Sequence, residues 1–337
     1  MHMADALLSP VVGGAFWIAS GALIIHSAKK ITEEHDVVKT PLMGVLGAFV
    51  FAAQMINFSI PGTGSSGHLG GGLLLAILLG PYRAFITLAS VLIIQCLFFA
   101  DGGLLALGCN MINLAFFPAF IAYPFIYRVI AGNSGSPGKL AAGSMTAATA
   151  GLLMGSLAVV LETLFSGITE LPFNTFLLFM LPIHLAIGIV EGLVTWGVLV
   201  FVSRTDPALL IPAKSSVRTR FSFALFAIPA LLTGGIGSWF ASSQPDGLEW
   251  SIAKVSGTEV LSTASGPVHE ALAAFQEKIV FLPDYGFKSA PKFNTDSKSP
   301  FNPGTSLSGI IGSLSVLAAA GTIGLVLGRK RSGQKSL

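Results

Sequence analysis

The stretch FNTFLLFMLPIHLAIGIVEGLVTWGVLVFVS, residues 173–203, decides the fold class, because Glu191 is its only charged residue. A helix that crosses a membrane needs about 20 consecutive apolar residues. In lipid only helices and closed barrels satisfy their backbone, and a continuous apolar run without alternation favours helices. The whole chain has the same character, with 53% hydrophobic and 10% charged residues, against about 25% charged in soluble domains. The sequence therefore predicts an all-α polytopic membrane protein.

Apolar segments of this kind recur along the chain and predict its domain organisation. They lie near 7–28, 41–59, 68–80, 82–100, 104–131, 140–168, 173–203, 221–242 and 307–328. The third is short for a span, which predicts a re-entrant or tilted helix. A polar linker at 206–220 separates a seven-helix domain, 1–205, from a two-helix hairpin, 221–337, that encloses an outer loop at 243–306. Small residues Gly44, Ala48 and Ala52 recur every four positions and predict helix packing or a docking face for a membrane partner.

Basic residues predict the orientation in the membrane, because cytoplasmic loops are enriched in Lys and Arg. With the N-terminus outside, the cytoplasmic residues are Lys29, Lys30, Lys39, Arg83, Arg128, Lys139, Arg204, Lys214, Arg218, Arg220, Arg329, Lys330, Arg331 and Lys335. The other five basic residues all fall in the long loop 243–306, a length at which this rule no longer applies. We therefore expect an outside N-terminus and a cytoplasmic C-terminus.

A candidate metal site is predicted by Met1-His2 together with His68 in the glycine-rich stretch PGTGSSGH, residues 61–68. The amine of Met1, the amide of His2 and the His2 imidazole Nδ1 would form two fused chelate rings. The imidazole of His68 would complete a plane of four nitrogens, which suits Ni(II) or Cu(II). The predicted topology puts both histidines on the outer side, and we expect no cleaved leader and a retained Met1. Because the ion displaces the amide proton, affinity should rise with pH.

Polar residues near the outer ends of the fourth and fifth apolar segments form a second group of candidates. They are Gln95, Asp101, Asn110 and Asn113. Amides and carboxylates in a membrane need partners. They either hydrogen-bond between helices or form a supporting layer that orients the metal-binding imidazoles.

A third group lies on one face of a single helix and consists of His184, Gly188, Glu191 and Gly192. The glycines predict the close approach of another helix, with His184 and Glu191 as a polar lock between the helices. An intramembrane metal-dependent enzyme that uses His184 and Glu191 is a rival hypothesis, although the His-Glu-x-x-His pattern of zinc hydrolases is absent.

Several motifs together resemble the CbiM/NikM family, the substrate-specific membrane components of energy-coupling-factor (ECF) transporters for nickel and cobalt. They are the Met-His start, PGTGSSGHL at 61–69, ADGGLLALGCN at 100–110 and HLAIGIVEG at 184–192. The resemblance covers about 1–205, and PDGLE at 245–249 is similar to the CbiN/NikN-type module, so the chain resembles a fusion of the two components. The start departs from the commoner Met-His-Ile-Pro-Asp-Gly by reading Met-His-Met-Ala-Asp-Ala, which keeps the two chelating residues.

This resemblance implies a seven-helix component that binds Ni2+ or Co2+ as its transported substrate through Met1, His2 and His68, without a cofactor. It implies a separate transmembrane coupling (T) component and cytoplasmic ABC ATPases. That agrees with the lack of a phosphate-binding loop around Gly138-Lys139, where Asn133 stands at the first glycine position. It further implies an integral protein of the cell membrane that binds no nucleic acid. A passive channel for divalent metals is the remaining alternative, and it predicts uptake without an ATPase.

Overall fold

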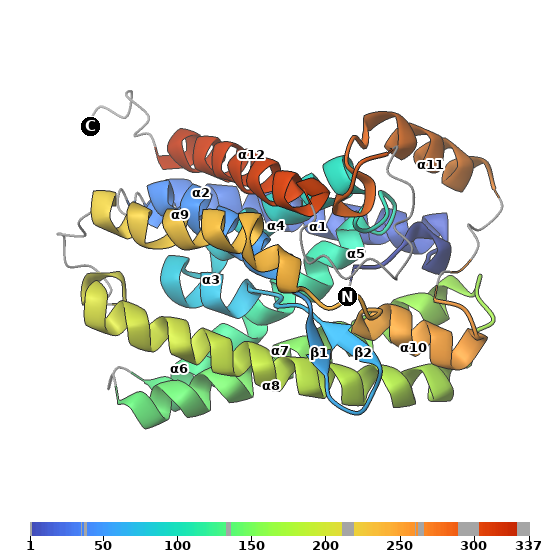
Figure 1. Cartoon of the computed structure of the whole chain (residues 1–337), viewed down its shortest axis with the longest axis horizontal. Coiled ribbons are helices and arrows are strands. Elements are labelled where there is room, and N and C mark those ends of the chain that lie inside the picture. Colours follow the sequence, from blue (N-terminus) through green and yellow to red (C-terminus); the bar gives the residue numbers. More distant parts are fainter. Residues whose placement is uncertain are drawn as a thin grey trace, which may run out of the picture.

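A computed structural model describes residues 2–34, 36, 39–132, 136–210, 219–259, 261, 266–288 and 303–328. Helices dominate it (Figure 1). They are α1 (Pro10–Glu34), α2 (Lys39–Gln54), α3 (Gly72–Leu79), α4 (Pro81–Phe99), α5 (Leu107–Met111), α6 (Arg128–Ala131), α7 (Pro137–Ser166), α8 (Phe173–Thr205), α9 (Thr219–Gly235), α10 (Gly247–Ser256), α11 (Pro267–Ile279) and α12 (Pro303–Gly328). A π-type helix, Ile112–Tyr127, joins α5 to α6 and contains Pro118 and Pro124. Proline cannot donate a backbone hydrogen bond, so it favours departures from regular α-helix.

Short elements complete the chain. The strands β1 (Phe58–Ile60) and β2 (Ser65–Gly67) pair antiparallel, with Phe58 opposite Gly67. Single 3-10 turns are η1 (Asp5–Leu7), η3 (Pro207–Leu209), η4 (Gly237–Phe240) and η5 (Pro283–Tyr285).

Each of the nine predicted apolar segments contains a helix, which confirms the all-α membrane fold. Within the described residues, 6 helices are long and apolar enough to cross a membrane. They are Pro10–Glu34, Pro81–Phe99, Leu107–Ala131, Pro137–Ser166, Phe173–Thr205 and Pro303–Gly328. Helices α2, α3 and α9 are shorter. Helix α3, at 8 residues, is too short to span alone and is almost entirely buried among its neighbours.

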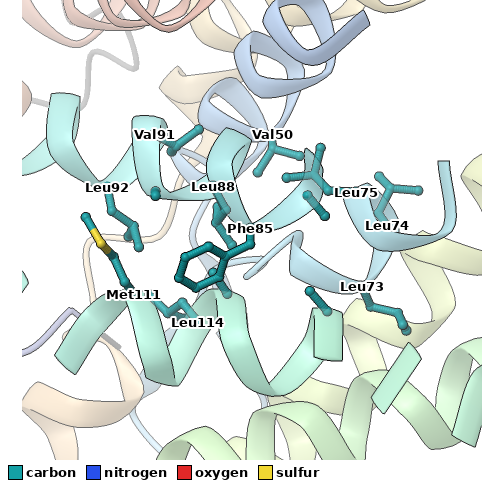
Figure 2. Close-up of a cluster of buried hydrophobic side chains, with 14 of the residues drawn as sticks. Val50, Leu73, Leu74, Leu75, Phe85, Leu88, Val91, Leu92, Met111 and Leu114 are labelled. Atoms are coloured by element: carbon teal, nitrogen blue, oxygen red, sulfur yellow. The ribbon is translucent and has the colours of Figure 1, made fainter. Parts of the chain in front are cut away.

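The core of the helical domain lies between α2, α3, α4 and α5 (Figure 2). Phe85 of α4 is fully buried at its centre. Leucine side chains of α3 and α4 surround it, and Met111 and Leu114 close the cluster from the next segment. This packing holds α3 in place and thereby fixes the loop that precedes it.

Glycines allow two close helix contacts. A Cβ atom at Gly188 or Gly192 of α8 would lie 2.7 Å from the Cα of Thr149 and 2.5 Å from the Cα of Met145, both in α7. Helix α12 packs on α2, where a Cβ at Gly44 would lie 2.7 Å from the carbonyl oxygen of Leu317. The small-residue face of α2 is therefore covered from within the same chain.

The connections at one end of the molecule gather around the β-hairpin. Strands β1 and β2 lie at this end beside α10, with α11 nearby, whereas α6 lies at the opposite end (Figure 1). Arg83, Glu34 and Thr40 form a polar contact between α4, α1 and α2, with Arg83 Nη1 2.6 Å from Glu34 Oε2. Part of the predicted linker, 211–218, lies outside the described residues, as do Lys214, Arg218 and the basic residues from Arg329 onward.

Candidate metal site

Two imidazoles that are distant in the sequence lie together at the hairpin end of the helices. The rings of His2 and His68 stack with their centroids 5.2 Å apart and their planes at 13°. Their side chains are only 6% and 9% exposed. The structure thus brings together the two predicted histidines, whereas Met1 lies outside the described residues.

The N-terminal arm, residues 2–8, positions His2. Asn110 of α5 accepts from the backbone N–H of Met3 at 2.8 Å and donates to the Met3 carbonyl at 3.3 Å. The N–H of Gly103 also donates to that carbonyl, at 2.9 Å. Because Met3 is completely buried, these bonds act where they are shielded from water. They fix the backbone next to His2.

The loop after the β-hairpin positions His68. The side chain of Glu191 on α8 accepts from the backbone N–H groups of Gly70 and Gly71, at 2.9 and 3.0 Å. Gln54 of α2 donates to the carbonyl of Gly70 at 2.9 Å. Two helices of the membrane domain therefore hold this loop through its backbone.

The C-terminal module, residues 219–328, covers the same hairpin. The N–H of Ser66 donates to the carbonyl of Pro245 at 2.8 Å, and its hydroxyl donates to the carbonyl of Gln244 at 2.7 Å. The indole N–H of Trp250 donates to the carbonyl of Thr63 at 3.0 Å. These contacts anchor the PDGLE motif directly on the segment that leads to His68.

Asp246 of this motif serves two purposes. Its side chain caps α10 by accepting from the backbone N–H groups of Leu248 and Glu249, and Glu249 bonds back to the N–H of Asp246. This reciprocal capping box fixes the carboxylate at the start of the helix. The second carboxylate oxygen lies 4.0 Å from Nε2 of His68. The motif therefore places a negative charge beside one candidate ligand.

A second carboxylate, Asp101, faces the other imidazole. Its Oδ1 lies 3.1 Å from Nδ1 of His2, and its Oδ2 accepts from the hydroxyl of Tyr285 at 2.5 Å. The ring of Tyr285 stacks on Phe99 of α4, with centroids 4.7 Å apart. Tyr285 and Asp284 have positive φ values of 58° and 49°. Such backbone strain in non-glycine residues concentrates at functional sites.

Burial and charge set the protonation of these groups. Burial lowers the pKa of His68 to about 3. Its imidazole is therefore neutral at pH 7 and has a lone pair for a metal. Burial alone would raise the pKa of Asp101, but His2 and the Tyr285 hydroxyl bring that pKa below its ordinary value. The site therefore combines the neutral imidazole of His68 with the ionised carboxylate of Asp101, a combination that attracts divalent cations.

The other predicted polar residues lie further from the imidazoles. Gln95 donates to the side chain of Gln54 at 2.9 Å. Asn113 donates to Glu162 of α7 at 2.8 Å and to the sulfur of Met3 at 3.6 Å. Of the four predicted supporting residues, Asp101 contacts an imidazole, Asn110 holds the arm through its backbone, and Gln95 and Asn113 bond one step further away.

Residues of the predicted polar lock bond to separate partners. His184 Nδ1 lies 2.8 Å from the carbonyl of Met180 in its own helix, whereas Glu191 binds the His68 loop. The glycines between them pack against α7 as described above. This helix face therefore supports the loop as well as the helix pair.

Sequence reasoning did not name three contributing residues, Asp246, Tyr285 and Gln54. Asp246 was within the recognised PDGLE motif, and its position before Gly-Leu-Glu is a capping signal. Tyr285 lies in the long loop 243–306 and had no local signal, because its contact with Asp101 joins segments 184 residues apart.

These features define a polytopic membrane protein with a buried, carboxylate-flanked pair of imidazoles at one end of its helices. The family described as "Cobalt uptake substrate-specific transmembrane region", CbiM, matches residues 2–209, and a PDGLE domain matches residues 220–329. The chain belongs to the CbiM family and carries a PDGLE module.

Known proteins agree with this assignment. The chain is 31% identical to a putative fused nickel transport protein NikMN of Archaeoglobus fulgidus, over 94% of this chain and 96% of the relative. It is 32% identical to the cobalt transport protein CbiM of Sorangium cellulosum, over 62% of this chain and 94% of the relative. A crystal structure of a transition metal transporter superposes with a TM-score of 0.54 at 31% identity, covering 67% of this chain and 99% of that one. The chain is therefore a multi-pass membrane component of metal transport, not an enzyme.

Proposed function

We propose that this chain is the substrate-binding component of an ECF-type importer for Ni2+ or Co2+, in which residues 1–205 bind the ion, 206–220 form a linker and 221–337 form a two-helix PDGLE module. The observation that carries the proposal is the stacking of His2 and His68 at 5.2 Å in a buried position. The N-terminal arm carries one ring and the loop after the β-hairpin carries the other, and both rings are shielded from solvent. Relatives named as nickel and cobalt transport proteins supply the substrate class.

The proposed ligands are the amine of Met1, the amide and imidazole Nδ1 of His2, and the imidazole of His68. Within the described residues no group of three or more His, Cys, Asp and Glu side chains is arranged to hold a metal. We therefore complete the proposed set with the amide nitrogen of His2 and the amine of Met1. Four nitrogens in one plane suit Ni(II) and disfavour hard cations such as Mg2+ and Ca2+.

Binding at this chelate requires a small movement of His2. Nδ1 of His2 faces Asp101 at 3.1 Å, and Nε2 is buried with no hydrogen-bond partner among the described residues. The ring must turn so that Nδ1 reaches the ion and the proton moves to Nε2. Asp101 lies beside the ring as the nearest charged acceptor, and such acceptors fix the tautomer of a metal-binding histidine.

The proposed orientation places this site outside the cell and the C-terminus in the cytoplasm, because basic residues concentrate at the opposite ends of the spans. Import then needs a membrane coupling protein and cytoplasmic ABC ATPases. Uptake by cells that lack those partners would instead support a passive channel.

The test is binding of Ni2+ and Co2+ to the purified full chain, compared with a variant that has one alanine inserted between Met1 and His2. The insertion keeps every side chain but adds an amide to the chelate, which then excludes His68. We expect the bound metal to be lost or its absorption spectrum to change, because the amine, two amides and the imidazole of the longer N-terminus would then supply four nitrogens without His68. The control inserts one alanine between Ser134 and Gly135, in the connection from α6 to α7.

A second pair of variants tests the imidazole of His68. His68→Ala should lower the affinity for Ni2+ at least about hundredfold, because it removes a proposed ligand and even partners outside the ligand set contribute 10–100-fold. His26→Ala removes an exposed histidine of α1 that contacts Tyr82, and it should bind as the native chain does. Unchanged binding in both the insertion and His68→Ala would contradict the proposal.

A further inference from the structure

A large cavity lies over the paired imidazoles. Its volume is about 600 Å³, and His2 and His68 are both part of its wall. The membrane domain contributes the arm and the loop at 100–103, and the C-terminal module contributes residues of α10, α11 and η5. The module therefore encloses a chamber over the site.

Acidic side chains dominate the charged lining of this chamber. They are Asp5, Asp101, Asp246, Glu249, Glu259 and Asp284. Among the described residues that line the cavity, none is Lys or Arg. Four of the six carboxylates belong to the C-terminal module, so the helical domain alone would present a much weaker negative field at its imidazoles.

Two further observations point to a cation as the occupant. Nε2 of His2, on a side chain only 6% exposed, has no hydrogen-bond partner within the described residues. The chamber also has room for a hydrated ion, because six waters at about 30 Å³ each occupy about 180 Å³. A smaller cavity would have required the ion to lose water before it entered.

We propose that this chamber is a vestibule that collects a hydrated divalent cation through Glu249 and Glu259 before the ion reaches His2 and His68. The inference rests on the proposed function and assigns a role to the C-terminal module. Clefts lined by charges of one sign raise the local concentration of the opposite ion and its association rate. Glu249 and Glu259 carry the argument because both side chains are exposed to the approaching ion.

The experiment measures the rate constants for Ni2+ association and dissociation with the purified full chain at two ionic strengths, about 0.01 M and 0.3 M. The variant is the double substitution Glu249→Gln and Glu259→Gln. Glutamine at 249 keeps an acceptor for the N–H of Asp246, so the cap of α10 is preserved. Glu259→Gln alone is the second variant, because this exposed position contributes least to the fold.

The control is the double substitution Glu270→Gln and Glu277→Gln on α11. It changes the net charge by the same amount, but neither residue lines the chamber. Comparison with this control separates the local field of the vestibule from the overall charge of the protein.

We expect the vestibule variant to bind Ni2+ about three- to tenfold more slowly at low ionic strength, with a flatter salt dependence and a nearly unchanged dissociation rate. Glu259→Gln alone should give a smaller change in the same direction, and the control should match the native chain. An unchanged association rate, or an equal effect in the control, would overturn the vestibule. A native chain that binds no Ni2+ would instead refute the proposed function.

Discussion

The arm that carries His2 and the loop after the hairpin that carries His68 are held in the site by different contacts. The two strands of the hairpin pair with each other, and Glu191 accepts a hydrogen bond from Gly70 in the loop that follows them. The arm depends on side-chain contacts from Asn110 and Asp101, and Tyr285 contacts Asp101 in turn. Both the arm and the His68 loop with its hairpin make hydrogen bonds to the membrane domain and to the C-terminal module.

This difference indicates which ligand is more easily released. The backbone hydrogen bonds of the hairpin loop end on a buried carboxylate and resist disruption. The arm is held through its backbone by the neutral amide of Asn110, whose hydrogen bonds are weaker than those to a charged group. We therefore infer that the arm is the movable half of the site and that the hairpin is the fixed half.

Removing the carboxylate that holds the His68 loop should cause the largest loss of Ni2+ affinity. Glu191→Ala leaves the N–H groups of Gly70 and Gly71 without their acceptor, and each such bond to a charged group contributes about 1.5–3 kcal/mol. We expect a lower thermal unfolding temperature and at least about a hundredfold loss of Ni2+ affinity, because the His68 loop shifts. Glu170→Ala, at an exposed position between α7 and α8, is the control. Native affinity in Glu191→Ala would show that the loop needs no such support.

Changing the pH should separate the two ligands. The pKa of His68 is lowered to about 3 by burial, so its imidazole stays neutral between pH 6 and 8. The arm must release the amide proton of His2 when the ion binds. Affinity should therefore rise about tenfold per pH unit for each proton released between pH 6 and 8. Isothermal titration calorimetry in buffers of different ionisation enthalpy counts those protons, and a pH-independent affinity would exclude the amide as a ligand.

Removing the charge of Asp101, which faces His2, should cause a smaller loss of Ni2+ affinity. Asp101→Asn removes a negative charge beside His2, and we expect about a 10–100-fold loss of Ni2+ affinity. Tyr285→Phe should weaken binding less, because the carboxylate remains. If Tyr285 acts through Asp101, the double variant should bind no more weakly than Asp101→Asn alone. Additive losses of affinity would show that Tyr285 acts independently.

Asn110→Ala should loosen the backbone of the arm. It removes both hydrogen bonds to Met3, and each bond contributes about 1 kcal/mol. We expect about a tenfold faster dissociation of Ni2+ and little change in the unfolding temperature of the helical domain. Asn57→Ala is the control, because Asn57 also lines the cavity. An equal change in dissociation rate in this variant would contradict a specific anchor at Asn110.

The smallest effect is expected where the module touches the hairpin through one side chain. Trp250→Phe keeps the ring but loses the bond to the carbonyl of Thr63, which amounts to about fivefold in affinity at 1 kcal/mol. Trp196→Phe is matched to it, because the indole N–H of Trp196 has no partner within the described residues. Equal binding by the two variants would mean that this contact does not support the hairpin.

The sequence by itself determined the membrane fold, because long apolar runs without charge admit only helices in lipid. It also selected His2 and His68, since a Met-His start and a histidine in a glycine-rich loop are local patterns. Helix contacts through Gly188 and Gly192 followed in the same way from spacing on one helix face.

Only the tertiary structure decided how the site is supported. The spacing of Glu191 predicts a polar lock between helices, and the tertiary structure adds that this buried carboxylate accepts hydrogen bonds from the His68 loop. Tyr285 reaches Asp101, and Asp246 reaches His68, across 184 and 178 residues of chain. Such contacts depend on how separate helices pack, and no local periodicity or motif encodes that packing.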